Sequence, residues 1–472
     1  MDNDAQPVSA QQAYDRLRAR FNEVGPLSIR DRRKALRALE KVLVARKSEI
    51  SAAISADFKG RAPSETFISE IFGAHSAARH ARRHVKEWAQ PEAVELPWFY
   101  KPARSRLEYQ PLGVVGIISP WNYPLLLAVS PIAGAIAAGN RVLLKPSELT
   151  PQTSALLARV LPEVLGDDVI AVVTGGAEVG NAFSRLPLDH LLFTGSTAVG
   201  RKVMAAASER LTPVTLELGG KSPALVHESF SLSTAATRIA MGKLFNSGQT
   251  CIAPDYVLCP EDKVADFVSA YQVAVKKLYP TIVANEEYTS IINDRHRGRL
   301  QGLLSQAVEA GATATEVNPA GEDFSVSPKM APVILTGLSE DAEILREEIF
   351  GPLLPVVAYK TLPDAIRYIN ARPRPLALYY FDRRRSRIRQ VMSETVSGGV
   401  TINHTLVHAS LDVLPFGGVG ESGMGSYHGF HGFETFSHRK SIIEASRMNL
   451  LPVLMRPRLY RMTRAFLRLM ML

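Results

Sequence analysis

The stretch GVVGIISPWNYPLLLAVSPIAGAIAAGNRVLLK (residues 113–145) carries the pattern that decides the fold. Residues 113–119 form a short apolar run of the kind found in buried strands. Residues 124–139 form a longer apolar segment that ends in glycine, which is typical of a helix, and residues 141–145 are again a short apolar run. A strand, a helix and a strand in close succession predict a βαβ unit with parallel strands.

The same alternation continues along the chain and predicts a doubly wound parallel sheet in an α/β fold. The further elements that we expect are a helix over 150–165, strands over 169–175 and 188–195, and a helix from about 198 to 210. From VTLELGGKSPALV (214–226) onward the alternation restarts with longer helices, which indicates a second α/β domain. The N-terminal region has helical periodicity over most of its first hundred residues. Residues 93–111 lose this periodicity, and we expect them to form two extended segments around a turn.

Length and cysteine usage narrow the class of protein. A chain of 472 residues is too long for one core and predicts two or three domains. Two cysteines, Cys251 and Cys259, are too few for a disulfide framework, and their spacing suits no usual zinc module. The start MDNDAQPVSA is polar and acidic, unlike a secretory signal. We therefore expect a reducing, cytoplasmic location and no metal site.

The net charge of +9 does not indicate nucleic-acid binding, because it is concentrated at one end. Residues 447–472 contain six arginines and no acidic residue, so the rest of the chain is close to neutral. From Pro457 this tail can form a helix with apolar residues on one face and arginines on the other. A basic amphipathic helix of this kind can lie on an anionic membrane or pack on the protein or its partner subunit, but its apolar run is too short to span a bilayer.

Two loops have the composition of a dinucleotide site. In LFTGSTAVGRKVMAAA (192–207), Gly195 follows a strand and Gly200 lies at a helix start, so backbone N–H groups and the Ser196 hydroxyl can face a pyrophosphate. An ordinary strand–helix turn would have the same composition. In LLKPSE (143–148), Lys145 and Glu148 lie at the carboxyl end of a parallel strand, where they can bind the two hydroxyls of a ribose.

A literal G-x-G-x-x-G occurs later, at residues 418–423 in PFGGVGESGMGS. Pro415 interrupts the approach to it and no βαβ unit surrounds it, so we do not interpret it as a dinucleotide fingerprint. We expect a loop near the C-terminal edge of a site instead.

Covalent chemistry is indicated by a cysteine, a carboxylate and an amide. FNSGQTC (245–251) ends on Cys251, and we expect its small and polar residues to leave the backbone around the thiol open to a ligand. Glu217 in TLELGG lies beside two glycines, and Asn122 in WNYP is an uncharged donor. A nucleophile, a base and an amide donor together suit acyl chemistry. Cys259 lies in the apolar stretch YVLC and is interpreted as a buried structural cysteine.

The motifs PWNYP, KPSE, FTGSTAVG, LELGGKSP, FNSGQTC, EEIFGP and PFGGVGESGMG, in this order, resemble those of the aldehyde dehydrogenase family. The resemblance covers about residues 10–445. IAPDYVL after Cys251 and the run GMGSYHGFHGFETFSHRKS resemble the class 3 branch, which includes fatty, benzaldehyde-type and coniferyl aldehyde dehydrogenases. The tail lies beyond this resemblance.

The resemblance implies roles for ten residues, matched motif by motif. The implied catalytic residues are Cys251 as nucleophile, Glu217 as general base and Asn122 as oxyanion donor together with the Cys251 backbone N–H. The implied cofactor contacts are Lys145 and Glu148 on the adenosine ribose, Gly195, Ser196 and Gly200 in the pyrophosphate loop, and Glu348 and Phe350 at the nicotinamide ribose.

The resemblance also implies a fold of three parts. We expect a Rossmann-type nucleotide-binding domain, an α/β catalytic domain and a small β oligomerisation arm, followed by the tail. The expected boundaries are 1–92 and 112–216 for the nucleotide-binding domain, 217–403 for the catalytic domain, 93–111 and 404–440 for the arm, and 441–472 for the tail.

The activity implied is oxidation of an aldehyde to the acid through a cysteine thiohemiacetal and thioester. Glu217 favours hydrolysis of the thioester over its capture by coenzyme A. A cofactor-independent thiol esterase or hydrolase, and a structural protein without catalysis, are alternatives that the cofactor loops and the catalytic residues disfavour. NAD is the expected cofactor because Glu148 would repel a 2′-phosphate, although members of this branch can take NADP.

The expected substrate is coniferyl aldehyde or a related aromatic aldehyde, and the alternative is a medium- or long-chain fatty aldehyde. Aromatic residues in and beside the motifs give weak support for a planar substrate. The expected assembly is a homodimer without nucleic acid, with at most peripheral membrane contact through the tail.

Overall fold

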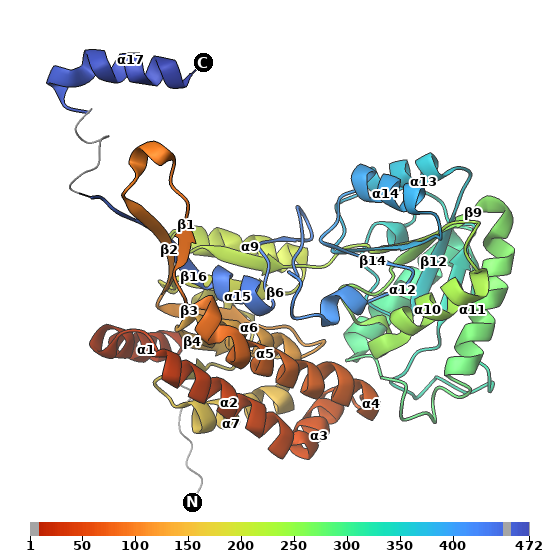
Figure 1. The fold of residues 1–472 in the computed structure, drawn as a ribbon. Coiled ribbons are helices and arrows are strands. Elements are labelled where there is room, and N and C mark those ends of the chain that lie inside the picture. Colours follow the sequence, from red (N-terminus) through yellow and green to blue (C-terminus); the bar gives the residue numbers. More distant parts are fainter. Residues whose placement is uncertain (1–8, 447–454, 472) are drawn as a thin grey trace, which may run out of the picture.

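The computed structural model describes residues 9–446 and 455–471, which build two lobes and a projecting arm (Figure 1). The lobe with the N-terminal half contains a six-stranded sheet. Its strands, in spatial order, are β15 (Gly423–Met424), β7 (Val214–Glu217), β6 (His190–Thr194), β3 (Val114–Ile118), β4 (Arg141–Lys145) and β5 (Ile170–Val172). All neighbours pair in parallel except β15 and β7. The parallel sheet predicted from residues 113–210 is therefore confirmed.

Strand β3 is buried on both faces and shows how the sheet joins two cores. Val115 and Ile117 belong to the core that α6 shares with the N-terminal helices, whereas Val114 and Ile118 belong to the core on the opposite face. This division follows from the two-residue period of a strand. Gly116 has no room for a side chain, since a Cβ there would lie 2.5 Å from Leu188 Cδ1.

The helices of this lobe cover both faces of the sheet. They are α1 (Ala10–Val24), α2 (Ile29–Ala45), α3 (Lys47–Asp57), α4 (Pro63–Glu65), the π-helix η1 (Thr66–Phe72), α5 (Gly73–Trp88), α6 (Leu126–Ala138), α7 (Pro151–Leu165), α8 (Ala177–Ser184) and α9 (Thr197–Ser208). Local signals set several of their ends. Ser28 caps α2 by accepting from the Asp31 N–H, and α6 ends at Gly139, whose φ of +99° suits glycine.

The other lobe contains a seven-stranded sheet. Its strands, in spatial order, are β10 (Thr313–Glu316), β11 (Val333–Thr336), β12 (Leu353–Tyr359), β9 (Tyr256–Pro260), β8 (Pro223–Val226), β13 (Ala377–Phe381) and β14 (Gly399–Ile402). Only the pair β10–β11 of this sheet is antiparallel. Its helices are α10 (Leu232–Leu244), α11 (Val264–Leu278), α12 (Asp294–Glu309), α13 (Leu362–Asn370) and α14 (Arg385–Glu394), with short turns η3 (Phe245–Gly248), η4 (Glu261–Lys263) and η5 (Glu343–Leu345).

Both sheets reverse their strand order next to the first strand in sequence. In the six-stranded sheet, β4 and β5 lie on one side of β3, and β6 and β7 lie on the other. Such a reversal leaves a crevice at the carboxyl ends of the strands, which is where ligands bind in open α/β sheets. The ends of β3, β4, β6 and β7 carry the loops predicted to bind the cofactor and substrate.

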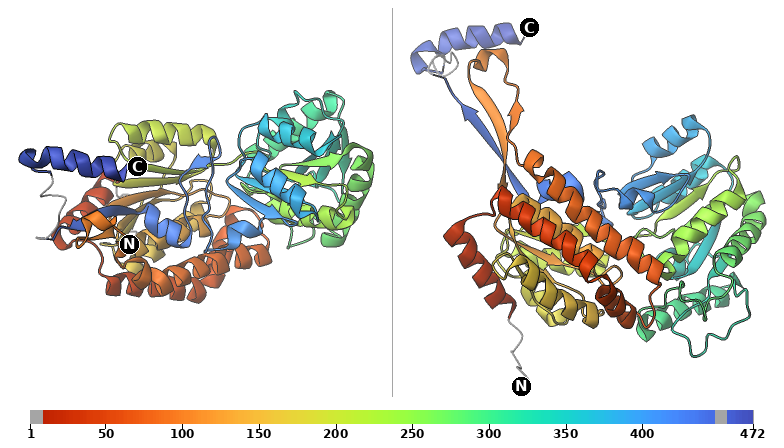
Figure 2. Two further views of the ribbon diagram at one scale, coloured as in Figure 1. Left: turned by 45° about the horizontal axis from the view of Figure 1, so that its top comes forward. Right: turned by 60° about the horizontal axis from the view of Figure 1, so that its bottom comes forward.

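The projecting arm is an antiparallel sheet of β1 (Glu92–Val94), β2 (Arg104–Pro111) and β16 (Ser437–Glu444). Figures 1 and 2 show it extending away from both lobes, with the turn η2 (Trp98–Tyr100) near its tip. The expected arm range 404–440 requires correction, because residues 404–436 do not join this sheet. They form η6 (Val407–Ser410), β15 and α15 (Gly429–Thr435), and α15 packs on α6.

The described part of the tail forms η7 (Pro457–Leu459) and α17 (Tyr460–Met470), as the helical pattern from Pro457 predicts. In Figure 1 and in the right view of Figure 2, α17 lies near the tip of the arm. The ring of Phe466 meets the ring of Trp98 edge-on, with centroids 6.0 Å apart. Of the described helices, none is long and apolar enough to cross a membrane.

Candidate active site

The three candidate catalytic residues come from distant parts of the chain. Asn122 lies in the turn between β3 and α6, Glu217 is the last residue of β7, and Cys251 follows η3. The Asn122 amide donates to the backbone carbonyl of Gln249, two residues before Cys251, at 3.2 Å. The Glu217 carboxylate is near enough to influence the Cys251 thiol electrostatically. The structure therefore brings all three together.

The loop before Cys251 has an unusual backbone. Asn246, Ser247 and Gly248 have φ values of 53°, 51° and 77°, in the region that residues other than glycine seldom adopt. A Cβ on Gly248 would lie 2.3 Å from the carbonyl oxygen of Gly351. Gly248 thus makes room for the neighbouring backbone, and not for a ligand as we expected from the sequence. Backbone strain of this kind is typical of functional sites.

Buried hydrogen bonds hold this loop in place. Gln249 donates through Nε2 to the carbonyls of Asn246 and Ser290 at 3.0 and 2.9 Å, and its Oε1 accepts from the Ile292 N–H at 2.9 Å. The hydroxyls of Thr250 and Tyr123 lie 2.6 Å apart. Both amide hydrogens of Gln249 and its side-chain oxygen are bonded inside the protein, so the role of Gln249 is to shape the loop.

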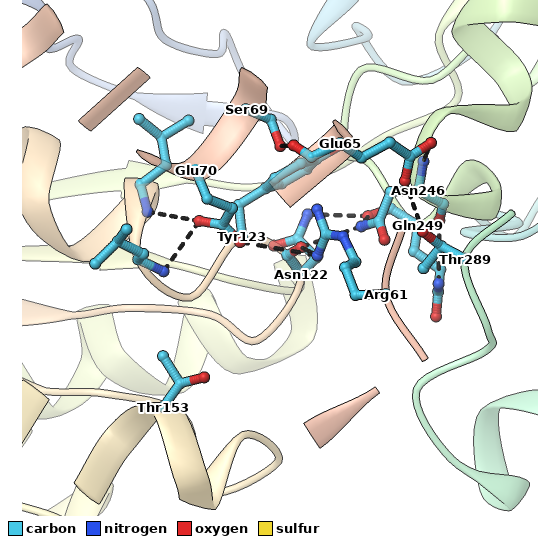
Figure 3. Close-up of polar contacts among 12 residues, drawn as sticks. Arg61, Glu65, Ser69, Glu70, Asn122, Tyr123, Thr153, Asn246, Gln249 and Thr289 are labelled. Carbon is cyan, nitrogen blue, oxygen red and sulfur yellow. Dashed lines mark hydrogen bonds and ion pairs between the residues drawn. The ribbon is translucent and has the colours of Figure 1, made fainter. Parts of the chain in front are cut away.

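Asn122 is bonded on both its backbone and its side chain (Figure 3). Its carbonyl accepts from Arg61 Nη1 at 2.8 Å and from Asn246 Nδ2 at 3.1 Å. Its own amide nitrogen uses one hydrogen on Gln249, and an amide nitrogen carries two. The second hydrogen has no bond within the described residues, and we expect it to stabilise an oxygen that forms beside Cys251.

Glu217 is 2% exposed, and within the described residues neither oxygen of its carboxyl group has a hydrogen-bond partner. Burial raises its pKa well above the usual value, because the charged form is poorly solvated there. A raised pKa makes the carboxylate a stronger base. The G-x-G-x-x-G stretch lies next to it, since Gly423 in β15 pairs with Glu217.

Cys251 keeps part of its surface exposed. Burial raises the pKa of its thiol to about 12, and the negative charges of Glu348 and Glu217 act in the same direction. The thiol is therefore protonated at neutral pH, and attack on a carbonyl requires a nearby base. Cys259 lies in β9 with no exposed surface, in the packed core, as the sequence predicts.

Glu348 lies against Gly219 of the LELGG motif. A Cβ on Gly219 would come within 2.2 Å of Glu348 Oε2, so a larger residue there would displace the Glu348 carboxyl group. Burial raises the pKa of Glu348 to about 8, and its Oε1 has no partner among the described residues. Phe350 has a φ of 53°, and its ring meets that of Trp121 at 5.3 Å.

A lysine and an aspartate anchor the segment that carries Glu348. Lys221 Nζ forms an ion pair with Asp255 and donates to the carbonyls of Ile344 and Glu347 at 2.8 and 2.9 Å. The other oxygen of Asp255 accepts from the Ile349 N–H at 3.0 Å. Lys221 follows the glycines of the LELGG motif, and Asp255 follows Cys251. Residues next to these two motifs therefore position the EEIFGP motif, which contains Glu348.

The candidate ribose contacts form a pair at the end of β4. Lys145 is buried, and its Nζ donates to Glu148 Oε2 at 2.9 Å. Burial acts to raise the pKa of the Glu148 carboxyl, but hydrogen bonds from Lys145 and from its own backbone, with the charges of Lys145 and Arg295, together outweigh burial, so the pKa lies below its usual value. Glu148 is therefore ionised at neutral pH and can accept from hydroxyl groups.

The candidate pyrophosphate loop is only partly available to a ligand. Gly195 donates its N–H to the Glu217 carbonyl at 3.0 Å, and the Ser196 hydroxyl caps α9 by accepting from Val199 N. Gly200 is buried inside α9, where a Cβ would lie 2.6 Å from Leu218 Cδ2. Gly200 thus permits close packing of the helix. Because Ser196 accepts from the Val199 N–H, the earlier N–H groups of α9, those of Thr197 and Ala198, are the donors left for a ligand.

These positions fit a nicotinamide dinucleotide. Lys145 and Glu148 lie at the end of β4, and the N-terminus of α9 follows β6, on the two sides of β3 where the strand order reverses. Glu348, with an unpartnered buried oxygen, lies near Cys251. The fit rests on the placement of the Lys145–Glu148 pair and the start of α9 at the ends of neighbouring strands, and on the unpartnered oxygen of Glu348.

Sequence reasoning did not find the buried residues behind the site. Arg61, Glu65 and Glu70 contact the Asn122 turn and the Cys251 loop (Figure 3). They lie in the helical N-terminal region, outside every motif, and their partners are 55 or more residues away in sequence. Charged residues in an amphipathic region are usually solvent-exposed. No local signal distinguishes these three buried residues from their exposed neighbours.

The comparisons with known proteins bear on the whole chain. The model of the aldehyde dehydrogenase family matches residues 3–442. The chain is 49% identical to a "probable coniferyl aldehyde dehydrogenase" of Pseudomonas aeruginosa, over 88% of this chain and 86% of that protein. It is 45% identical to the coniferyl aldehyde dehydrogenase of Pseudomonas sp., over 93% and 92% of the two chains. A dimeric NADP-preferring aldehyde dehydrogenase of Rattus norvegicus is 40% identical, over 92% and 94%.

Solved structures agree. The substrate-bound state of Staphylococcus aureus AldH superposes with a TM-score of 0.91 at 37% identity, covering 97% of this chain and 99% of that one. An aldehyde dehydrogenase of Mycobacterium tuberculosis complexed with NAD+ has a TM-score of 0.82 at 30% identity, covering 92% and 90%. The family resemblance and the fold predicted from the motifs are both confirmed.

Proposed function

The chain belongs to the aldehyde dehydrogenase family, and we propose that it oxidises its substrate to the carboxylic acid through a thioester on Cys251. It is an oxidoreductase that acts on aldehydes and uses NAD(P). The observation that carries the proposed mechanism is the contact of the Asn122 amide with the Cys251 loop, with the Glu217 carboxylate close by.

The reaction begins with attack of the Cys251 sulfur on the aldehyde carbon. A buried base must take the thiol proton, since the thiol itself is a weak acid here. The carbonyl oxygen becomes negatively charged, and the free N–H of Asn122 and the Cys251 backbone N–H stabilise it. One oxyanion donor of this kind contributes about 3–4 kcal/mol to the barrier reduction.

The second half of the reaction releases the acid. A nicotinamide dinucleotide, when bound, supplies a hydride acceptor. Loss of hydride from the carbon leaves a thioester on Cys251. Glu217, with its raised pKa, takes a proton from a water molecule, and the resulting hydroxide attacks the thioester carbonyl. Asn122 stabilises the oxygen a second time, and the thiolate leaves.

Residues at the expected positions would hold the cofactor. Lys145 and Glu148 would bind the adenosine ribose, the Gly195–Gly200 loop the pyrophosphate, and Glu348 with Phe350 the nicotinamide ribose. Glu148 is ionised and would repel a 2′-phosphate, which supports NAD as the preferred form. The NADP-preferring relative indicates that NADP should be tested alongside it.

We propose coniferyl aldehyde or a related aromatic aldehyde as the substrate. The names of the two Pseudomonas relatives support this choice. The rings of Trp121 and Phe350 also meet near the candidate site. Aromatic side chains can pack on one another without binding substrate, so a fatty aldehyde is the second candidate.

We further propose a cytoplasmic homodimer assembled through the arm of β1, β2 and β16. An arm that projects from both lobes buries little of its own surface, so a second subunit would cover it. The basic helix α17 would add at most a salt-sensitive contact with an anionic membrane. Its exposed apolar residues include Met462 and Leu469.

The experiment that tests the function is a set of initial rates with coniferyl aldehyde, benzaldehyde and decanal, each with NAD and with NADP. We expect the largest kcat/KM for coniferyl aldehyde with NAD, and the free acid as product. A larger kcat/KM for decanal would reject the aromatic substrate. Quenching of protein fluorescence by NAD excludes a cofactor-independent hydrolase, and its absence would favour one.

A further inference from the structure

A buried arginine lies directly behind the candidate oxyanion donor. Arg61 is 2% exposed, and its guanidinium lies over the rings of Phe58 and Tyr123, at 4.7 and 4.9 Å from their centres. Among the described residues it makes one hydrogen bond, from Nη1 to the carbonyl of Asn122 at 2.8 Å. Within the described residues, its Nε and Nη2 have no hydrogen-bond partner. The directional polar contact of Arg61 is therefore made to Asn122.

Two buried carboxylates flank this arginine, and each holds one part of the site. Glu70 Oε2 accepts from the N–H groups of Leu125 and Leu126, where α6 begins just after the Asn122 turn, at 3.1 and 2.8 Å. Glu65 Oε1 accepts from the Asn246 N–H in the Cys251 loop at 3.0 Å. Figure 3 shows Arg61 between these two contacts.

The π-helix explains how both carboxylates face the site. Glu65 immediately precedes η1 and Glu70 lies within it, five residues later. In a π-helix the hydrogen bonds join residues five apart, so residues at this spacing lie on the same face. In an α-helix the same spacing would turn one of them away. The π-helix is thus the local structure that this arrangement needs.

Packing stability does not account for the group. Burying charges is costly, and replacement of a buried ion pair by apolar residues often leaves a protein equally stable. Arg61 Nη1 lies 3.8 Å from Glu70 Oε1, which is longer than a hydrogen bond. Arg61 and Glu70 bond poorly to each other, but both make short hydrogen bonds to backbone groups at and just after Asn122. This arrangement is better suited to positioning that backbone than to stabilising the fold.

We propose that Arg61 is a positioning residue for the oxyanion donor. By holding the carbonyl of Asn122, and with Glu70 and Glu65 fixing the two adjoining backbones, it keeps the Asn122 amide aimed at the point where the Cys251 sulfur attacks. Arg61 bonds to Asn122 and makes no hydrogen bond to Cys251 among the described residues. Its effect on the reaction passes through Asn122.

The test is a double-mutant cycle between Arg61→Met and Asn122→Ala. The measured rate is acylation by 4-nitrophenyl acetate, seen as a burst of 4-nitrophenolate, which needs the thiol and the oxyanion donor but no cofactor. We expect Arg61→Met alone to slow acylation by about 10- to 100-fold, because misplacement of one donor forfeits much of its contribution. In the Asn122→Ala background the same change should cost less than about 2-fold.

The matched control is Arg32→Met. Arg32 is also buried, at 7% exposed, and donates to the carbonyls of Leu27 and Ala137, away from the site. Its replacement should lower the unfolding temperature as Arg61→Met does, while leaving acylation unchanged. Quenching of fluorescence by NAD should be the same in all variants. If Arg61→Met fails to fold, the charge-balanced Arg61→Met/Glu70→Gln variant enters the cycle in its place.

The inference rests on the proposed function, and the two fail differently. Wild-type protein that is acylated by the ester but oxidises no aldehyde would reject the proposed function alone. Full-rate acylation in Arg61→Met would reject the positioning role. If Arg61→Met slowed acylation by the same factor with and without the Asn122 side chain, the positioning role would also be rejected. Equal factors would mean that the two residues affect the rate independently.

Discussion

Cys251 and Cys259 differ in their surroundings, although both thiols are uncharged at neutral pH. Cys251 lies on a strained loop beside an amide donor and two carboxylates, whereas Cys259 lies within a strand and has no exposed surface. A reactive cysteine needs access and a nearby base, and only Cys251 has both.

Cys251→Ala should abolish aldehyde oxidation and leave NAD binding intact, because the nucleophile lies outside the adenosine contacts. Cys259→Ala should keep most of the activity and lose some stability through the small cavity it creates. Steady-state rates and fluorescence titration with NAD measure both effects. The reverse pattern would show that the nucleophile has been misassigned.

Glu217→Gln should transfer hydride once and then turn over slowly. The amide has nearly the same shape but cannot take a proton from water, so the thioester persists. Stopped-flow absorbance should show a burst of NADH approaching one per site, followed by a steady state slowed by about 100-fold or more. A variant without a burst would place the action of Glu217 before hydride transfer, at the Cys251 thiol.

At the scale of elements, local sequence signals predict where many helices and strands begin and end. Thr150 and Pro151 precede a regular apolar pattern, and α7 spans Pro151–Leu165 as predicted. Gly139 ends α6 in a left-handed backbone conformation, which glycine adopts without strain. The strand RVLLK was predicted at its observed limits because a fully buried strand is a continuous apolar run.

Elements that depend on distant partners could not be found this way. Strand β16 pairs with β2 along its whole length, yet SHRKSIIE has no alternation that marks a strand. The carboxylates of Glu65 and Glu70 contact segments that begin 55 residues or more away. Their burial follows from tertiary packing. An amphipathic helical pattern in the sequence does not predict that these carboxylates are buried.

The Cys251 loop gives a prediction at this scale. Gly248→Ala should destabilise the protein by about 1–3 kcal/mol or more, because its φ of 77° and the nearby Gly351 carbonyl both exclude a Cβ. The loop must shift, so acylation of Cys251 should also slow. Scanning calorimetry and the ester burst measure the two effects.

The matched control is Gly302→Ala in α12. A Cβ at Gly302 meets nothing within 4 Å, and alanine favours a helix by about 0.5–1 kcal/mol over glycine. This change should raise the unfolding temperature and leave activity unchanged. Equal behaviour of the two variants would contradict the account of the loop.

At the scale of the whole molecule, the arm and the tail helix are the parts that the two lobes do not bury. Helix α17 touches the arm through Phe466 and Trp98, while Met462 and Leu469 are 62% and 71% exposed. Five arginines lie in the described part of the tail, which contains no acidic residue. Such a helix can bind anionic lipid or a second subunit.

The full-length protein should sediment with anionic liposomes at low salt and dissociate at high salt, since each arginine near the surface contributes only about 1 kcal/mol. A protein ending at Arg447 should remain in the supernatant in both conditions, as should the full-length protein with zwitterionic liposomes. Full-length protein that stays in solution at low salt would exclude the membrane role. Loss of the dimer on truncation would show instead that α17 packs on a partner.

The central claim is that the aldehyde carbon becomes a thioester on Cys251, and trapping this intermediate tests it most directly. Glu217→Gln protein is mixed with NAD and coniferyl aldehyde, quenched in acid and analysed by peptide mass spectrometry. We predict that the peptide containing Cys251 gains the mass of the acyl group, and that the peptide containing Cys259 does not. An unmodified Cys251 after one equivalent of NADH has formed would contradict the account.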